Sequence, residues 1–342
     1  MKRTKGILAL TLFSTMVLFA QDALVKQALD AGLKPIPKDN SELMKLINNP
    51  KNPITKAKVE LGKRLFFEPR LSKSGWISCN SCHNLAIGGV DGLSAAVGHK
   101  WTLNPHHLNS PTVYNAVFMK RQFWDGRSPD LEDQAQGPMQ APPEMAITKE
   151  MAVKRITSMP KYVKWFKEAY GDDVKITFKL IADTIALFER TLVTPSRFDD
   201  FLNGNGDALT KKEKEGLKLF ISKGCASCHN GVGIGGSMQK FPIKGKYKYA
   251  NIGDFKGDKN GMVKTPTLRN IEESAPYFHN GAIWTLKEAV KEMGNTQLGI
   301  KLSDSESEKI VTFLKSLTGK KPNINYPQLP VITPNTPKPD LN

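Results

Sequence analysis

The spacing of hydrophobic residues predicts a mainly α protein. Apolar residues recur at helical intervals over residues 59–67, 148–170 and 176–193. Pro160 is expected to interrupt the second of these helices, and Pro195 to follow the end of the third. No stretch alternates apolar and polar residues as a β-strand would. We therefore expect helices that are joined by long irregular loops.

Capping boxes predict three helix starts in the second half of the chain. Each places Ser or Thr three residues before Glu, and they begin at Thr210, Thr285 and Ser303. Residues 196–207 are polar and rich in glycine, which predicts a linker between two domains, residues 21–193 and 194–319. From residue 321 onward there are six prolines in 22 residues, so this tail is expected to run extended over the surface.

The first twenty residues are typical of a secretory signal peptide. Lys2, Arg3 and Lys5 precede an uncharged apolar run over residues 7–20. This run of 14 residues is shorter than the roughly 20 residues that cross a bilayer. We expect cleavage after Ala20 and export to the periplasm, with an uncleaved anchor as the alternative. No later segment is apolar enough to span a membrane.

The composition excludes several classes of protein. The chain has 342 residues, of which 39% are hydrophobic and 24% charged, and this balance excludes a disordered, fibrous or multi-span membrane protein. The length suits two domains. The formal net charge is +16, and it falls to about +13 without the first twenty residues. The sequence has no nucleic-acid-binding motif. We interpret the charge as a basic solvated surface, or as a means to steer an acidic partner protein.

The four cysteines indicate the chemistry. They form two C-x-x-C-H motifs, which are Cys79-Asn80-Ser81-Cys82-His83 and Cys225-Ala226-Ser227-Cys228-His229. This motif attaches c-type haem, because its two thiols form thioethers with the vinyl groups and its imidazole binds the iron. The two motifs lie 146 residues apart, too far for the usual zinc site of two C-x-x-C pairs. Disulfides would leave the histidines unexplained, and no βαβ pattern supports a redox pair. The sequence therefore predicts two haem c groups in two cytochrome c-like domains.

A short repeat supports this duplication. The pattern G-x-x-L-F occurs at residues 62–66 and again at residues 216–220, each time on a predicted helix ahead of a haem motif. We interpret it as a helix that leads into a haem-binding turn, used twice.

The ligand on the opposite face of each haem iron determines what the haem does. The candidates are His99, His106, His107, His279, Met238, Met262 and Met293. His99 follows His83 by 16 residues in a glycine-rich loop, which would let it move on and off an iron. Met293 lies near the end of a predicted short helix and is the best-placed methionine. His106 and His107 are most simply surface residues, and His279 a neighbour of a haem rather than a ligand.

The chain resembles the bacterial dihaem cytochrome c peroxidases from about residue 40 to 320. The resemblance is carried by seven ordered segments. They are residues 65–72 (LFFEPRLS), 77–83 (ISCNSCH), 89–92 (GVDG), 109–116 (NSPTVYNA), 122–127 (QFWDGR), 265–270 (TPTLRN) and 275–281 (APYFHNG).

This resemblance implies roles for the iron ligands. His83 would bind the iron of the haem that reacts with peroxide, and His99 would be its displaceable second ligand. His229 and Met293 would hold a higher-potential haem through which electrons enter. Trp124 would lie between the two haems, where sequence alone would favour a packing role.

The resemblance also implies a peroxide pocket and a calcium site. Gln134 and Glu144 would line the pocket, with Gln134 orienting peroxide and Glu144 moving a proton between its oxygens. Proton transfer of this kind contributes roughly 10²–10⁴-fold to a rate. Calcium would be bound between the domains by the Asn109 side chain and by the carbonyl groups of Ser274 and Pro276.

The implied activity is the reduction of hydrogen peroxide with electrons from a small cytochrome c or a cupredoxin. The resemblance further implies a homodimer and a C-terminal tail, residues 320–342, that returns to the first domain. Two other functions stay open. One is a dihaem electron carrier without peroxide chemistry. The other is an oxidase of protein side chains, like the dihaem enzyme that matures the methylamine dehydrogenase cofactor, although Met293 stands where that relative has tyrosine.

Overall fold

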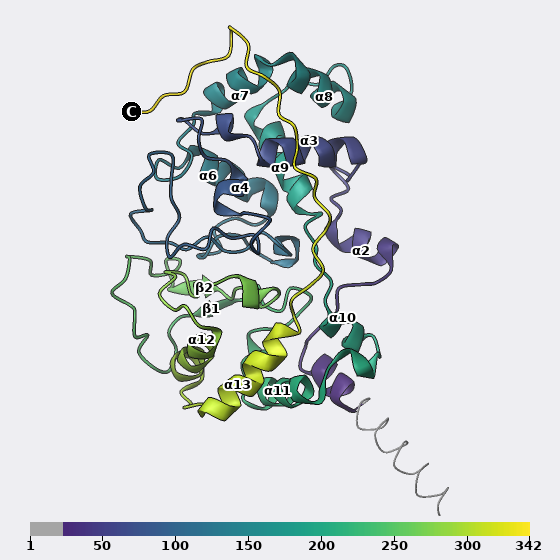
Figure 1. Ribbon diagram of the computed structural model, residues 1–342, viewed down its shortest axis with the longest axis vertical. Helices are drawn as coiled ribbons and strands as arrows, with labels where there is room; N and C mark the ends of the chain where they lie inside the picture. Colours follow the sequence, from purple (N-terminus) through teal and green to yellow (C-terminus); the bar gives the residue numbers. More distant parts are fainter. Residues whose placement is uncertain (1–22) are drawn as a thin grey trace, which may run out of the picture.

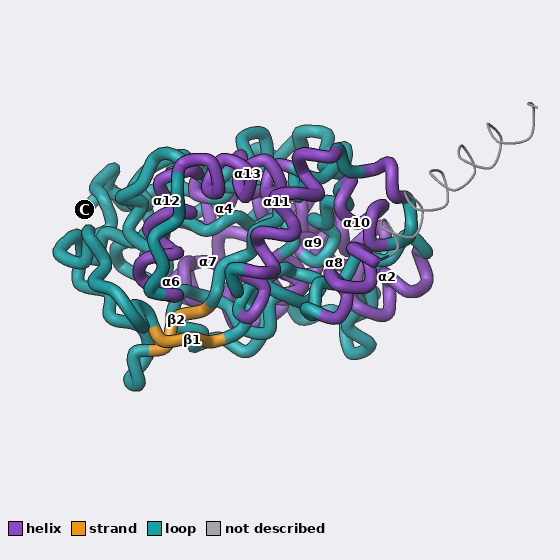
Figure 2. Tube along the Cα trace, turned by 90° about the horizontal axis from the view of Figure 1, so that it is seen from below, coloured by secondary structure: helices purple, strands orange, loops and turns teal. Residues whose placement is uncertain are grey.

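The computed structural model describes residues 23–342, which form two helical domains joined by long loops (Figure 1). The predicted signal peptide, residues 1–20, lies outside the described residues. Among the residues from 23 onward, no helix has both the length and the hydrophobicity to cross a membrane. Loops make up much of the described chain, as Figure 2 shows, and the largely helical fold predicted from the sequence is confirmed.

The helices fall into two groups that occupy opposite ends of the molecule (Figure 1). The first group comprises α2 (Asn40–Ile47), α3 (Lys56–Phe66), α4 (Cys79–Cys82), α5 (Leu131–Gln134), α6 (Gln136–Gln140), α7 (Lys149–Thr157), α8 (Pro160–Tyr170) and α9 (Phe178–Glu189). The second comprises α10 (Arg197–Leu202), α11 (Lys211–Ser222), α12 (Leu286–Met293) and α13 (Asp304–Lys315). Two short antiparallel strands, β1 (Met238–Lys240) and β2 (Met262–Lys264), lie in the second half.

Shorter turns complete the secondary structure. A further helix covers residues 23–30. Single 3-10 turns lie at Pro69–Leu71, Ala116–Phe118, Gly206–Ala208, Cys225–Ser227 and Ile271–Glu273, and a π-helical turn follows α12 at Gly294–Leu298.

Most helix boundaries follow the predicted signals. The capping boxes at Thr210 and Ser303 form as expected, and Thr285 also caps its helix by accepting a hydrogen bond from the Glu288 amide. Pro160 stands in the first turn of α8, where proline is tolerated, and so separates α7 from α8. The predicted linker at residues 196–207 is wrong in part. Helix α10 forms there, because its aromatic side chains pack into the second core.

The repeated glycine explains how each domain is built. Helix α3 packs against α9, and α11 packs against α13 in the same way. A Cβ atom at Gly62 would overlap the carbonyl oxygen of Thr184, and one at Gly216 would overlap that of Lys309. Only glycine therefore allows these helices to cross so closely.

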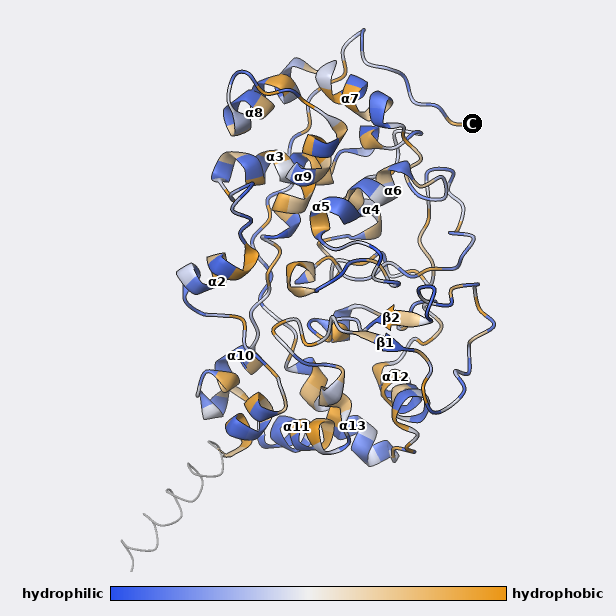
Figure 3. Cartoon of the chain, turned by 180° about the vertical axis from the view of Figure 1, so that it is seen from behind, coloured by the Kyte–Doolittle hydropathy of each residue, from blue (hydrophilic) through white to orange (hydrophobic). Residues whose placement is uncertain are grey.

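Each crossing is surrounded by its own hydrophobic core. Phe66 and Phe188 are buried in the first core, and Phe220 and Phe313 hold the equivalent places in the second. Apolar and polar segments alternate along these helices, as the hydropathy colouring of Figure 3 shows. The helix at residues 23–30 contributes Leu24 and Ala28 to the second core, although the sequence placed it with the first domain.

The C-terminal tail runs back along the first domain, as the yellow trace in Figure 1 shows. The buried guanidinium of Arg155 donates to the carbonyl oxygens of Ser72 and Lys338. Arg70 likewise donates to the carbonyl oxygen of Pro330 at 2.8 Å. The tail thus helps to hold the loop that leads into α4 and its haem motif.

Candidate active site

One cavity of about 670 Å³ lies between the domains and reaches both C-x-x-C-H motifs. Its lining includes every cysteine of the chain, together with His83 and His229. It also brings together seven other predicted site residues, which are Asn109, Trp124, Gln134, Glu144, Ser274, Pro276 and Met293. His99 is not part of this lining.

The first histidine is held ready to bind iron. His83 follows the single turn of α4, and its Nδ1 lies 2.9 Å from the carbonyl oxygen of Pro111. The carbonyl can only accept, so Nδ1 carries the proton and Nε2 keeps a free lone pair. Burial lowers the pKa of His83, and it lowers the pKa of His229 to about 4. Both imidazoles are therefore neutral, the form that binds a metal.

The four cysteines suit thioether formation. All are free thiols that line the cavity in pairs. Burial raises the pKa of Cys82 to about 12 and that of Cys225 to about 11. Neutral thiols beside neutral imidazoles, on the walls of an apolar cavity, fit a covalently attached haem at each motif.

The three methionines considered as iron ligands differ in their position relative to the cavity. Among the described residues, Met293 lines the cavity, whereas Met238 and Met262 lie on the small sheet outside it. Met293 is the last residue of α12, and the π-helical turn begins directly after it. A thioether in this position suits a haem whose other ligand is His229.

His99 is buried beside the cavity rather than in its wall. Its amide donates to the carbonyl oxygen of Glu144 at 2.7 Å, and its side chain is only 5% exposed. Its Nδ1 has no hydrogen-bond partner among residues 23–342. The preceding residue, Gly98, lies against the carbonyl group of Pro143 so closely that no Cβ would fit. The loop that carries His99 is thus packed directly on the loop that carries Glu144.

Glu144 and Gln134 come from neighbouring elements, and both line the cavity. Gln134 ends α5, and Glu144 lies in a tight turn after α6, with its amide donating to Ala141. Burial raises the pKa of Glu144, while the Arg127 guanidinium partly opposes that rise. A carboxyl group with a raised pKa is suited to accept and return a proton near neutral pH.

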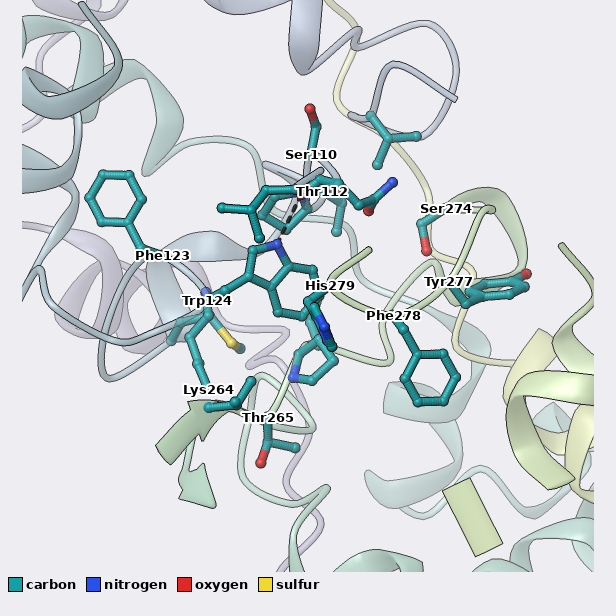
Figure 4. A pocket seen from close by; sticks show the side chains of 18 of the residues that line it. Ser110, Thr112, Phe123, Trp124, Lys264, Thr265, Ser274, Tyr277, Phe278 and His279 are labelled. Carbon is teal, nitrogen blue, oxygen red and sulfur yellow. Dashed lines mark hydrogen bonds between the residues drawn. The ribbon is translucent and has the colours of Figure 1, made fainter. Parts of the chain in front are cut away.

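Trp124 lies at the meeting point of the two domains. Its indole N–H donates to the carbonyl oxygen of Asn109 at 2.9 Å, and its ring meets His279 edge-on with ring centres 6.4 Å apart (Figure 4). The amide of Asn109 donates to the carbonyl oxygen of His279, and that of Lys264 donates to the carbonyl oxygen of Trp124. The two domains are therefore joined by a pair of matching hydrogen bonds.

These matching bonds show that the internal repeat is longer than the sequence analysis found. Residues 109–116 correspond to residues 264–271, so Asn109 and Lys264 hold equivalent places, and Trp124 corresponds to His279. Asn115 and Asn270 both have a left-handed backbone and both donate to the hydroxyl of Thr194. The sequence does contain a sign of this longer repeat, namely the S/T-P-T pattern that both segments share, but few other residues are identical between them.

The predicted calcium ligands fit a cation that prefers oxygen. Asn109 donates through Nδ2 to the carbonyl oxygen of Leu93 at 2.8 Å, which leaves its Oδ1 for another partner. Ser274 and Pro276 line the same cavity. No group of three or more His, Cys, Asp or Glu side chains suited to a metal occurs in the described part of the chain. A calcium ion there would thus rely on amide and carbonyl oxygens.

Two buried ionisable residues of the lining were missed by sequence reasoning. Glu189 lies at the end of α9, and burial raises its pKa to about 8. Its equivalent in the second domain is Leu314, one residue after Phe313 as Glu189 follows Phe188. Lys264 ends β2 and is 6% exposed. The one sign in the sequence that Glu189 is buried is its place at the end of a helix whose other residues on this face are apolar.

Comparison with known families agrees with this geometry. The family model described as di-haem cytochrome c peroxidase matches residues 56–207, and the cytochrome c model matches residues 213–318. A cytochrome c551 peroxidase of Pseudomonas aeruginosa is 45% identical over 332 residues, which cover 93% of each chain. This chain belongs to the di-haem cytochrome c peroxidase family. It is accordingly an enzyme with two haem c groups, and the family supports peroxide reduction.

Other relatives lead to the same family. A cytochrome c551 peroxidase of Nitrosomonas europaea is 48% identical over 287 residues, covering 82% of this chain and 85% of the relative. A crystal structure of a MauG-like protein associated with microbial copper homeostasis shares 28% identity and has a TM-score of 0.70. That match covers 80% of this chain and 93% of the other. The predicted two-domain cytochrome c-like fold is thereby confirmed.

Proposed function

We propose that this protein reduces hydrogen peroxide to two waters in the periplasm, with electrons from a small cytochrome c or a cupredoxin. The observation that carries the proposal is the cavity whose lining contains both haem motifs together with Glu144 and Gln134. The four cysteines with His83 and His229 would hold two haems. Bound haem supplies an iron that accepts and passes single electrons.

Electrons are proposed to enter at the second domain, where His229 and Met293 provide a histidine and a thioether ligand. Methionine ligation raises the potential of a haem relative to a second histidine. Trp124 and His279 fill the space between the domains and are in contact with each other. Their rings provide a short route toward the first domain and His83.

Glu144 is proposed as the group that moves the proton. Its carboxylate would take the proton from one peroxide oxygen and return it to the other, so that the O–O bond can break with release of one water. Two electrons supplied through the haems and two protons from solvent would convert the remaining oxygen to the second water. The Gln134 amide donates a hydrogen bond that orients the peroxide. Arg127 also lines this part of the cavity, and its positive charge favours the ionised form of Glu144 in which it acts as a base.

His99 is proposed to be the displaceable ligand of the first haem. In the structure its loop packs on the Glu144 loop, and its imidazole is outside the cavity wall. A movement of residues 92–107 would be needed to bring His99 to the iron, and the same movement would shift Glu144. Binding of His99 and access of peroxide would thus exclude each other.

Calcium and dimer formation complete the proposal. The cation would bind Asn109, Ser274 and Pro276, which come from both domains, and Asn109 accepts a hydrogen bond from Trp124. It would therefore fix the relative position of the two haems. The homodimer is carried over from the resemblance.

The experiment that tests the proposed chemistry replaces Glu144 by Gln in the holoprotein. The E144Q variant should bind both haems with unchanged spectra but reduce peroxide about 10²–10⁴-fold more slowly. Glu168→Gln is a matched control, because Glu168 is an exposed residue on α8 and does not line the cavity. Wild-type turnover in E144Q would remove Glu144 from the mechanism. No turnover in the wild type with any donor would favour a simple electron carrier.

A further inference from the structure

Lys264 is a buried cation without an anion. Its side chain is 6% exposed and lines the cavity between the domains. Its Nζ atom forms no hydrogen bond or ion pair with any residue from 23 to 342, and the residue lines the cavity. An unpaired buried ammonium costs several kcal/mol, so a partner is expected from outside the protein chain.

The acidic residues of the cavity do not supply this partner. Asp125 is the carboxylate that acts on Lys264 electrostatically, but it is already paired with Arg127 at 2.9 Å. Asp254 is paired with His106 across the domains at 3.0 Å. Neither Glu144 nor Glu189 is among the charged groups that act on Lys264.

The other cations of the lining differ from Lys264 in one respect. Arg127, Lys240 and Lys256 all line the same cavity, but each is exposed to solvent. Water can therefore solvate their charges, whereas Lys264 depends on what fills the cavity. The equivalent position in the first domain holds the neutral Asn109, so a lysine is not required by the repeated backbone.

The position of Lys264 is also fixed. It ends β2, its amide donates to the carbonyl oxygen of Trp124 at 2.7 Å, and its side chain is drawn beside Trp124 in Figure 4. The segment that follows reaches Pro266, which lies in the cavity wall near His229. Lys264 is therefore held at the domain boundary, where the groups that fill the two halves of the cavity meet.

We propose that the Lys264 ammonium binds a propionate carboxylate of haem at the domain boundary beside Trp124. Each haem brings two carboxylates, and among the cations of the lining Lys264 is buried whereas Arg127, Lys240 and Lys256 are exposed. Pairing with Lys264 would reduce the negative charge near the iron and so raise the midpoint potential of that haem. This inference rests on the haems of the proposed function, but not on peroxide reduction.

The test is spectroelectrochemistry of the holoprotein with Lys264→Met, Lys264→Gln and Lys264→Arg. K264M and K264Q should lower the midpoint potential of at least one haem. The reduction equilibrium should change on the order of tenfold, which is about 59 mV for one electron. K264R keeps the charge and should stay close to the wild type. Lys240→Met, an exposed cation of the same lining, is the matched control and should leave both potentials unchanged.

The outcomes are distinguishable from failure of the proposed function. Haem content, measured by the pyridine haemochrome spectrum, shows whether each variant is loaded. Loaded K264M and K264Q with both potentials equal to the wild type would overturn the proposal. A wild type without peroxidase activity would leave this comparison of potentials intact. If K264M fails to fold, K264Q against K264R gives the same comparison of a neutral with a charged side chain.

Discussion

At the scale of single residues, the chemistry is concentrated in side chains that burial has changed. His83, His229 and Glu144 all line the cavity. Burial lowers the pKa of both histidines and raises the pKa of Glu144, and each shift favours the neutral form of the side chain. Neutral imidazoles can bind iron, and a carboxyl group with a raised pKa suits the proton transfer proposed for Glu144.

Glu189 makes the stability of the fold depend on pH. Its pKa is about 8 in the folded protein, above the usual 4.5, because burial disfavours the carboxylate. The folded state therefore keeps a proton that the unfolded state loses between about pH 4.5 and 8. The free energy of unfolding should fall through this window by at most about 1.4 kcal/mol per pH unit from this group.

Replacement by leucine tests this expectation, since leucine stands at the equivalent position 314. The melting temperature of E189L minus that of the wild type should increase as the pH rises from 5 to 8. The exposed Glu168→Gln provides the baseline. A difference between E189L and wild type that stays constant over this range would show that Glu189 is ionised in the folded protein.

At the scale of helices, the same crossing is built twice around a glycine. Gly62→Ala and Gly216→Ala should each reduce the free energy of unfolding by about 1–3 kcal/mol, because the new methyl group meets a backbone carbonyl that cannot move aside. Lys218→Ala, on the exposed side of α11, is the control and should be nearly neutral. Chemical unfolding of the holoprotein measures all three. Equal stability of G62A and wild type would contradict the close crossing.

The helices were predictable because their signals are local. Capping boxes, Pro160 and the G-x-x-L-F repeat each act within a few residues, and the structure forms the corresponding boundaries. The linker prediction failed because Phe198 and Phe201 are buried by distant helices, which local polarity does not reveal. The helix at residues 23–30 joined the second core for the same reason.

The site was predictable only in part. The two haem motifs were recognised from the spacing of their cysteines and histidines. The roles of Trp124, Gln134, Glu144 and Met293 were predicted from the resemblance to the family. Lys264 and Glu189 were missed, because an isolated charged residue gives no sign in sequence that it is buried. They stand out only when the two halves of the chain are aligned, because the equivalent residues, Asn109 and Leu314, are neutral.

At the scale of the whole molecule, the positive charge bears on the choice of partner. The chain carries 49 Lys and Arg against 33 Asp and Glu. An acidic donor protein would be drawn toward such a surface at low salt, where the Debye length is about 30 Å at 0.01 M and about 8 Å at 0.15 M. Turnover at limiting donor should therefore fall as sodium chloride is raised over this range. A flat profile with an acidic donor would argue against steering, and an uncharged chemical donor provides the control.

The arrangement of two domains around one cavity is the central feature of the molecule. One domain contributes His229 and Met293 to the lining, which we propose hold a haem that passes electrons, and the other contributes His83, Glu144 and Gln134. Trp124 and His279 join the two halves. Two similar domains are thus proposed to perform different tasks.

The most direct test is an optical titration of the purified holoprotein with calcium present. One electron is added per molecule, and hydrogen peroxide follows in stoichiometric amount. We predict a high-spin signal from the first haem, present at rest or formed on half-reduction, that one equivalent of peroxide consumes. If both haems stay low-spin and do not react with peroxide in any redox state, the protein is an electron carrier and Glu144 is a structural loop residue.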